Sequence, residues 1–354
     1  MKTSVVKLDP QYPDLKQIAF CAKVIRKGGI VVFPTETVYG MAADFANPKA
    51  MKRLRELKNR SEDKPFSILI SQRGLISNYT SMTDPRLYKL IDACWPGPLT
   101  IVVSAKEEGK TIGVRMPDHP IALMLVKDSQ CTIAAPSANV KGANPPSTFQ
   151  ETLRDMDGLV DVIIDGGSSR IGSGSSVVDM VGERPVMLRE GAITKDDIEK
   201  IIKRKIILFV CTGNSCRSVM AEYLLKHMLD DRDNVEVVSA GTGVFLQSSA
   251  SAETISVLLE EGIDATEHVS QPLNTILLKK ADLIIVMTMG HRVQVLERVP
   301  VVEKRVYLLN EFTNAASSGQ MASDVADPIG KPHSLYKECL EEIKEAIVKI
   351  KDLV

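Results

Sequence analysis

The stretch Ile206 to Ser218, which reads IILFVCTGNSCRS, decides the fold of the second half of this chain. Its opening, IILFV, is a β-branched run of the kind that forms a buried parallel strand. The following loop places five residues between Cys211 and Arg217, and Gly213 and Asn214 among them suit a tight turn. Beyond the loop, apolar residues recur at helical spacing. The stretch therefore predicts a strand, an anion-binding loop and a helix in direct succession.

The chemistry of the loop is that of a phosphate site with a nucleophile. Its backbone N–H groups and the N-terminus of the following helix would point at an anion, and the same field favours a thiolate at Cys211. Arg217 offers a planar fork that can bind two phosphate oxygens. The alternative is a buried cysteine near an ordinary salt-bridged arginine, and the tight-turn residues of the loop argue against it.

CTGNSCRS resembles the loop of the low-molecular-weight protein tyrosine phosphatase family, and the resemblance extends toward the end of the chain. Its further motifs are VEVVSAGTG at 235–243, ADLIIVMT at 281–288 and the late pair Asp327-Pro328. The resemblance implies a doubly wound parallel sheet of the low-molecular-weight phosphatase type over residues 204–354.

The resemblance also implies a catalytic set. Cys211 would attack phosphorus, Arg217 and the loop amides would hold the phosphate oxygens, and Asp327 would protonate the leaving group and then activate water. Asp324 is a competing carboxylate, and an Asp-Pro pair is also a common turn. The phosphate-binding loop would further comprise Thr212, Gly213, Asn214, Ser215, Cys216 and Ser218. No metal or other cofactor is expected for this phosphoprotein phosphatase reaction.

Two loop residues bear on the substrate and on redox chemistry. Ser215 resembles the small hydroxylated residue of the family's protein arginine phosphatases, whereas its tyrosine phosphatases usually have a bulky aliphatic residue there. This favours phosphoarginine over phosphotyrosine modestly, since those arginine phosphatases have Thr at this place and an aromatic residue at that of Ile329. Cys216 is either a redox partner for oxidised Cys211 or a small packing residue.

Length and composition point to two soluble domains. A chain of 354 residues is too long for one typical core, and a net charge of -1 with 25% charged residues gives no basic excess for nucleic-acid binding. The six cysteines have no disulfide or zinc spacing, and neither a signal peptide nor a membrane-spanning run is apparent. A cytoplasmic location without membrane contact is therefore expected.

The domains are predicted at residues 1–200 and 204–354, joined near 191–205, where Thr194 resembles a helix N-cap.

Residues 1–193 alternate short β-rich runs with helices. This density of strands around two or three helices predicts an α/β fold with a twisted mixed sheet and helices packed outside. One helix is predicted from PKAMKRLRELKNR, where Met51, Leu54 and Leu57 share a face. The predicted strands lie in IVVFPTE, FSILIS, LTIVVSA, TIGVRMP, TIAAPSAN, VDVIIDGG, SSVVDMV and PVMLRE.

Polar clusters at the ends of these runs indicate an anion-rich ligand. Each cluster alone is weak evidence for a ligand site, because a lysine or arginine at a helix end is more often a partner of the helix dipole. Their order is more specific: GGIVVFPTETVYG, KNRSEDKP, WPGPLT, VRMPDHP, APSAN and VMLREG resemble the YrdC-like threonylcarbamoyl-AMP synthase family. That family joins L-threonine, bicarbonate and ATP into threonylcarbamoyl-AMP and pyrophosphate, for the N6-threonylcarbamoyl modification of adenosine 37 in tRNA.

Carried over by motif position, two groups of residues would bind the substrates. ATP would contact Lys58, Arg60, Lys64, Thr111, Ser137, Asn139 and Arg189. Threonine would contact Thr35, Arg115 and Ser175, and Arg115 would pair with its carboxylate. Mg²⁺ is expected with the phosphates of ATP, and proteins of tRNA modification are expected as partners downstream. His119 is expected to be a loop residue and Trp95 a packing anchor.

Two departures from the synthase family accompany this resemblance. Its longer members have a small accessory domain that helps to close the nucleotide site, and here the phosphatase-like half occupies that place. Gly174 and Ser176 stand where many relatives have an acidic residue and Thr. The chain is predicted to be a bifunctional enzyme. The alternative is that its first domain is a nucleotide- or RNA-binding sensor that regulates the phosphatase.

Overall fold

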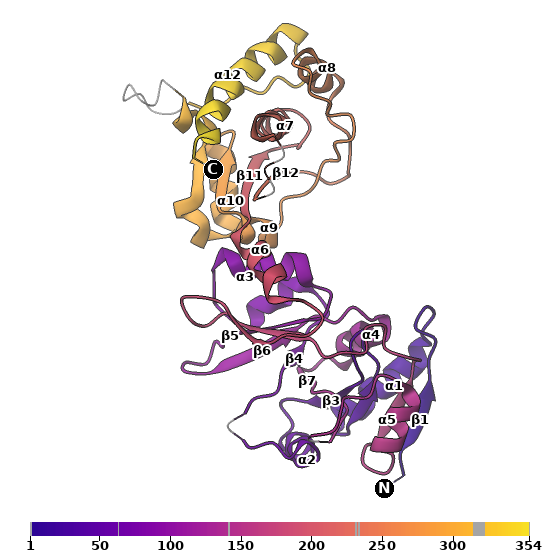
Figure 1. Cartoon of the computed structure of the whole chain (residues 1–354). Coiled ribbons are helices and arrows are strands. Elements are labelled where there is room, and N and C mark those ends of the chain that lie inside the picture. The colour runs from indigo at the N-terminus through magenta and orange to yellow at the C-terminus, as the bar shows by residue number, and fades with distance from the viewer. Residues whose placement is uncertain are drawn as a thin grey trace. The chain divides into compact units, whose positions relative to one another are not determined.

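A computed structural model describes residues 2–62, 64–140, 142–230, 232, 234–313 and 323–353. The chain divides into two compact units (Figure 1). The first comprises Met1–Met82 and Leu90–Glu199, and the second comprises Thr83–Lys89 and Lys200–Val354. In the part of the chain that is described, no helix combines the length and the apolar character needed to cross a membrane.

The first unit is built on a mixed sheet with the strand order β1-β8-β2-β3-β7-β4-β6-β5-β9-β10. The sheet contains both parallel pairs, such as β1 with β8, and antiparallel pairs, such as β2 with β3. Each of the eight predicted runs contains one of its strands, and β1 and β3 were missed. The strands are β1 (Ser4–Lys7), β2 (Val31–Phe33), β3 (Gly40–Asp44), β4 (Ile68–Leu69), β5 (Leu99–Ser104), β6 (Thr111–Arg115), β7 (Ile133–Ala134), β8 (Val162–Asp165), β9 (Ser176–Asp179) and β10 (Val186–Arg189).

Helices cover both faces of this sheet. Apolar residues of α1 and α4 pack with Val31 and Phe33, whereas those of α2 and α5 pack with Ile30 and Val32. The expected number of two or three helices is wrong, because the described residues form five between β1 and β10. They are α1 (Leu15–Arg26), α2 (Pro48–Lys58), α3 (Pro85–Cys94), α4 (Pro120–Ser129) and α5 (Phe149–Met156), with the 3₁₀ helix η1 at Arg73–Asn78. The predicted helix PKAMKRLRELKNR corresponds to α2, which begins with Pro48 after an Asn47 N-cap.

Helix α6 (Lys195–Lys203) leads into the second unit. The hydroxyl of Thr194 accepts a hydrogen bond from the backbone N–H of Asp197 at 3.2 Å, and it donates one to the Asp197 carboxylate at 2.6 Å. This is the N-cap arrangement that the sequence predicts at this place.

The second unit is a doubly wound parallel sheet with the order β12-β11-β13-β14. Successive side chains of strand β11 enter two different hydrophobic cores. Ile207 and Phe209 pack with α7, α8 and α12, and Leu208 and Val210 pack with α9 and α10. The predicted α/β class and its two sheet types are therefore confirmed. The elements are β11 (Lys205–Cys211), β12 (Val235–Gly241), β13 (Leu283–Val286), β14 (Val306–Leu308), α7 (Arg217–Leu229), α8 (Ala252–Glu260), α9 (Thr275–Lys280), α10 (Met289–Arg298), α12 (His333–Lys351), η2 (Pro300–Arg305) and η3 (Leu309–Phe312).

Candidate functional sites

The loop between β11 and α7 curls around the Cys211 sulfur. Strand β11 ends at Cys211 and α7 begins at Arg217, as the sequence predicts. The backbone N–H of Asn214 lies 3.2 Å from Cys211 Sγ, and Ser218 Oγ lies 2.9 Å from the same atom. Asn214 has a φ of 51°, a left-handed conformation that asparagine tolerates. The loop therefore directs a backbone donor and a hydroxyl at the Cys211 sulfur, as an anion-binding loop with a nucleophile at its base would.

The Asn214 side chain fixes the shape of this loop from behind. Its Nδ2 donates to Ser239 Oγ at 2.6 Å and to Ser218 Oγ at 3.1 Å. Its Oδ1 accepts from the backbone N–H of Gln271 at 2.9 Å, and its backbone carbonyl lies 2.9 Å from His268 Nε2. Asn214 is fully buried, so these contacts preorganise the loop. Gln271 and His268 were not predicted from the sequence, because each comes from an irregular segment more than 50 residues away.

A second histidine holds the opposite side of the loop. His291 Nε2 lies 2.9 Å from Thr212 Oγ1, and its Nδ1 lies 2.9 Å from the hydroxyl of Thr288, the N-cap of α10. Burial, and then the nearby Arg217 guanidinium, lower the pKa of His291 to about 4. The imidazole is therefore neutral at physiological pH, and it links the loop to α10 without adding charge.

Arg217 and the predicted acid Asp327 lie together. Arg217 is 5% exposed, and its Nη2 donates to Asp327 Oδ2 while its Nη1 donates to the Val325 carbonyl at 3.1 Å. The competing carboxylate, Asp324, accepts instead from the backbone N–H of Met289 at 2.7 Å. Of the two candidate acids, Asp327 is thus the one in contact with the loop arginine.

Cys216 and Ser215, whose roles the sequence does not decide, have different neighbours. Cys216 is buried, with its sulfur 3.4 Å from Ser251 Oγ and 4.0 Å from the Tyr336 hydroxyl. Ser215 is half-buried, and its hydroxyl lies 3.7 Å from Cys216 Sγ. The remaining predicted residue, Gly213, is exposed at the tip of the loop.

The first unit contains a cavity of about 550 Å³. Nine of the ten predicted substrate-binding residues line it, namely Thr35, Lys58, Arg60, Lys64, Thr111, Arg115, Ser137, Ser175 and Arg189. The tenth, Asn139, lines an adjoining hollow of about 790 Å³, which shares Lys58, Arg60 and Lys64 with the cavity. The structure therefore brings together side chains that the sequence scatters over 155 positions, from 35 to 189.

The charge of this cavity is one-sided. Its described lining includes five cationic side chains and no carboxylate: Lys58, Arg60, Lys64, Arg115 and Arg189. In the described part of the chain, the acceptors of Lys58 Nζ are neutral oxygens, including the Asn139 carbonyl at 2.7 Å and Asn139 Oδ1 at 3.0 Å. Burial, and then Arg60, lower the pKa of Lys58 to about 8. An anion is the counter-charge that this cavity lacks.

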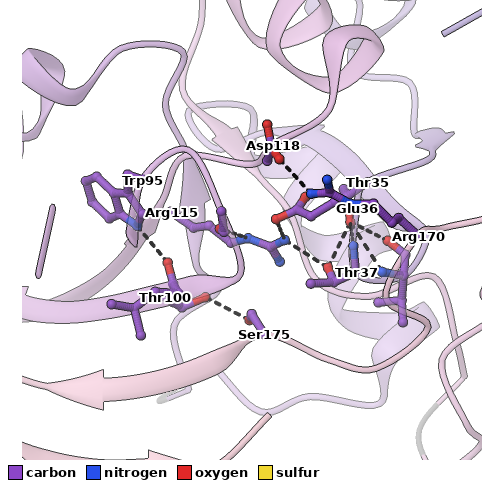
Figure 2. A network of polar contacts seen from close by, with 12 residues as sticks. Thr35, Glu36, Thr37, Trp95, Thr100, Arg115, Asp118, Arg170 and Ser175 are labelled. Carbon is purple, nitrogen blue, oxygen red and sulfur yellow. Dashed lines mark hydrogen bonds and ion pairs between the residues drawn. The ribbon is translucent and has the colours of Figure 1, made fainter. Parts of the chain in front are cut away.

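One wall of the cavity is a polar network around Arg115 (Figure 2). Arg115 Nη2 donates to Glu36 Oε1 at 2.7 Å and to Thr37 Oγ1 at 2.8 Å. Directly before β9, Ser175 Oγ lies 3.0 Å from Thr100 Oγ1 of β5 and accepts from Arg189 Nη2 at 3.0 Å. This wall offers fixed guanidinium and hydroxyl groups to a small ligand.

Three further sequence expectations can be placed. Trp95 is 1% exposed and donates to the Leu99 carbonyl at 2.7 Å, as a packing anchor does. His119 precedes α4 as its N-cap, in a loop as expected, and burial lowers its pKa. Gly174 lines the cavity, whereas Ser176 Oγ accepts from the backbone of Gly191 and of Ile193 and ties that segment to β9.

Comparisons with known proteins agree with this division. Residues 23–191 match the Sua5/YciO/YrdC family, described as "Telomere recombination", and residues 206–353 match "Low molecular weight phosphotyrosine protein phosphatase". The threonylcarbamoyl-AMP synthase of Bacillus subtilis is 38% identical over 195 residues, which are 52% of this chain and 56% of that protein. A protein of Methanocaldococcus jannaschii is 33% identical over 184 residues, which are 50% of this chain and 87% of that protein.

A solved structure extends the likeness. The crystal structure of Sua5 from Pyrococcus abyssi, complexed with L-threonine, is 26% identical in sequence and has a TM-score of 0.54. The match covers 86% of this chain and 99% of the Pyrococcus abyssi chain. The chain spans about half the length of the first curated relatives, from 49% to 57%.

Proposed function

We propose that this chain, which belongs to the Sua5/YciO/YrdC family in its first unit and carries a low-molecular-weight phosphatase domain in its second, is a bifunctional enzyme. The first unit would form threonylcarbamoyl-AMP and pyrophosphate from L-threonine, bicarbonate and ATP. The second would hydrolyse phosphoproteins through a cysteinyl-phosphate intermediate. The family memberships and the two sites support these activities independently.

The observation that carries the synthase proposal is the cationic cavity. Five lysines and arginines face it, with no carboxylate among the described lining residues. A nucleoside triphosphate supplies several adjacent negative charges, and the reaction needs a triphosphate, a carboxylate and a carbamate held together, which is a task of positioning and charge stabilisation. Lys58, Arg60, Lys64, Thr111, Ser137, Asn139 and Arg189 would contact ATP, and Thr35, Arg115 and Ser175 would contact threonine.

Mg²⁺ would accompany the nucleotide rather than occupy a protein cage. The described residues include no group of three or more His, Cys, Asp or Glu side chains that could hold a metal ion. The cavity does offer hydroxyl oxygens, such as those of Thr111 and Ser137. These donors fit an ion held chiefly by phosphate oxygens, where it neutralises their charge.

The product would serve the threonylcarbamoyl modification of adenosine 37 in tRNA. An acyl-adenylate cannot modify tRNA without a transfer step, so proteins that carry out this step would be the partners downstream. A cytoplasmic location fits this role, and all six cysteines are free, as in a reducing compartment.

The test of the synthase is release of pyrophosphate from ATP that depends on both L-threonine and bicarbonate. Full-length protein should release pyrophosphate when both are present and lose this release when either is omitted. The alternative, a nucleotide- or RNA-binding sensor, predicts nucleotide binding without turnover. Folded protein that binds ATP and releases no pyrophosphate would therefore favour the sensor.

The geometry of the second site supports a phosphatase. Cys211 would attack phosphorus, the loop from Thr212 to Ser218 with Arg217 would hold the equatorial oxygens, and Asp327 would protonate the leaving group. Ser215 supports phosphoarginine over phosphotyrosine as the substrate, because a hydroxyl can accept a hydrogen bond from a guanidinium.

The substrate is tested by parallel hydrolysis of a phosphoarginine protein and a phosphotyrosine protein. Wild type should prefer phosphoarginine, and Ser215→Ile should shift the preference toward phosphotyrosine. Ser251→Ala is a matched control, since Ser251 contacts Cys216 and caps α8 without belonging to the loop. A wild-type preference for phosphotyrosine would refute the assignment of phosphoarginine and leave the phosphatase assignment intact.

A further inference from the structure

We infer that Glu36 is a positioning residue that aims Arg115 at the amino-acid substrate of the first unit. Arg115 lines the cavity and Glu36 does not, so Glu36 lies behind the arginine. The inference rests on the proposed function, in which Arg115 pairs with the threonine carboxylate. It adds a residue with no direct substrate contact whose loss should alter threonine binding specifically.

The Glu36–Arg115 pair is buried. Glu36 Oε1 accepts from Arg115 Nη2 at 2.7 Å, and the side chains are 1% and 10% exposed, respectively. Such a pair is costly to desolvate, and removing one partner leaves an uncompensated charge in a medium of low polarity. Figure 2 shows the pair within the polar network, and Arg115 lines the cavity, where a fixed guanidinium serves binding.

Glu36 is committed to this single arginine. Its second oxygen, Oε2, is buried and has no hydrogen-bond partner among the described residues. The backbone carbonyl of Glu36 accepts from the N–H of Ile171 at 2.8 Å, which fixes the segment that carries the side chain. The carboxylate therefore has a defined place and one strong interaction, with Arg115.

The contacts of Arg115 leave one end of its guanidinium for a ligand. Nε donates to the Gly97 carbonyl at 3.2 Å, and Nη2 donates to Glu36 and to Thr37. Nη1 has no hydrogen-bond partner in the described part of the chain, and Arg115 faces the cavity. Since the other two nitrogens are fixed by protein, Nη1 is held ready for a substrate carboxylate.

The decisive variant is Glu36→Asp, which keeps the charge and shortens the side chain by one methylene. The guanidinium should follow the shortened carboxylate and move away from the position that binds the substrate. A misplacement of about 1 Å in an active site can lower the reaction rate on the order of 100-fold. We expect the dissociation constant for L-threonine, measured by calorimetry, to rise about 10- to 100-fold, while that for ATP changes less than about two-fold. Glu36→Gln, which keeps the shape and an acceptor, should show a smaller rise.

L-Threoninamide separates positioning from general damage, because it lacks the carboxylate that Arg115 would bind. Glu36→Asp should weaken L-threonine binding and leave L-threoninamide binding near the wild-type value. Arg115→Lys should do the same, and the double variant should add little to either single change, as expected for residues that act as one unit. Asp118→Asn, which removes the exposed Asp118–Arg170 pair of 2.6 Å nearby, should change neither ligand.

Unaltered L-threonine binding in both Glu36 variants would overturn the inference, as would an equal loss of L-threonine and L-threoninamide. The failure of the synthase proposal looks different: wild type would bind L-threonine without releasing pyrophosphate, and the comparison of binding constants would still decide the role of Glu36. Wild type that binds no L-threonine would overturn both.

Discussion

Arg217 of the phosphate loop is ion-paired with Asp327, and the same guanidinium also donates to the Val325 carbonyl at 3.1 Å. The two residues are 110 positions apart in the chain. The cation that would bind phosphate thus contacts the carboxylate that would protonate the leaving group. We therefore expect the phosphate group of a substrate to compete with Asp327 for the Arg217 guanidinium.

This competition predicts tighter binding of phosphate when the carboxylate is removed. In Asp327→Asn, inorganic phosphate no longer displaces a charged partner from Arg217. Partly exposed ion pairs contribute little, so the inhibition constant for phosphate should fall by about two- to five-fold. Competitive inhibition of aryl phosphate hydrolysis measures it. An inhibition constant that rises instead would mean that Asp327 holds Arg217 in its binding position.

The same variant should lose turnover according to the leaving group. General acids typically contribute about 10²- to 10⁴-fold, and they matter most where the leaving group is poor. Asp327→Asn should therefore slow phenyl phosphate more than p-nitrophenyl phosphate. Asp324→Asn is the control, because Asp324 bonds the backbone of Met289 instead. A larger loss in the control would reassign the acid.

Cys211→Ser should abolish hydrolysis of aryl phosphate, whereas Cys216→Ser should retain most of it. The loop amide of Asn214 and the hydroxyl of Ser218 converge on Cys211, while Cys216 faces Ser251 and Tyr336. Initial rates at saturating substrate measure the effect. Comparable loss in both variants would contradict Cys211 as the nucleophile.

Gly241 gives a test of loop geometry. A Cβ at this position would lie 2.5 Å from the Thr212 carbonyl and 3.0 Å from the Asn214 backbone N, both in the phosphate loop. Gly241→Ala should thus displace the loop and lower kcat/KM by about 100-fold, as small misplacements do. At Gly243 the nearest atom would be 3.5 Å away, so Gly243→Ala should stay near wild type. Equal activity of both variants would show that the loop tolerates a shift.

Lys58 should make nucleotide binding depend on pH. Its pKa in the folded protein is about 8, against an ordinary value of 10.5, so the ammonium loses its proton as pH rises through 8. The dissociation constant for ATP should therefore rise between pH 7.5 and 9.5. Lys58→Arg, which stays charged throughout, should flatten this profile. Calorimetry without threonine or bicarbonate isolates the effect, and an unchanged inflection in the variant would exclude Lys58 as its origin.

The stability of the protein in the absence of ATP should increase with pH, whereas its affinity for ATP should decrease. Between pH 8 and 10.5 the unfolded chain binds the Lys58 proton and the folded protein does not, so the contribution of Lys58 to stability increases with pH over that window and is lost as pH falls through 8. Lys58→Arg should remove this increment from the pH dependence of unfolding.

Local sequence was sufficient to predict those structural features that are formed by one short segment of the chain. The strand, loop and helix around Cys211 follow from a β-branched run, turn residues and helical spacing. Strand β3 was missed because GMAAD lacks the β-branched residues that mark a strand, and its burial comes from its neighbours in the sheet.

Contacts between residues far apart in the sequence could be identified only from the fold. Glu36 and Arg115 lie 79 positions apart, and Thr212 and His291 lie 79 apart as well. Nothing in the composition of either segment identifies the other, because a glutamate or a histidine is compatible with many partners. The family resemblance supplied Arg115 and Thr212, and the sheet topology supplied the residues that support them.

The one-sided charge of the first cavity has a consequence for the folded protein itself. Of its five cations, Arg115 is paired with Glu36, and the other four gather without a carboxylate among the described lining residues, so that they repel one another and a bound polyphosphate would relieve that repulsion. A ligand that binds the native state alone stabilises it by about 2.7 kcal/mol when present at about 100 times its dissociation constant. A nucleotide present at that excess would therefore stabilise this unit, and its removal would make the unit easier to unfold.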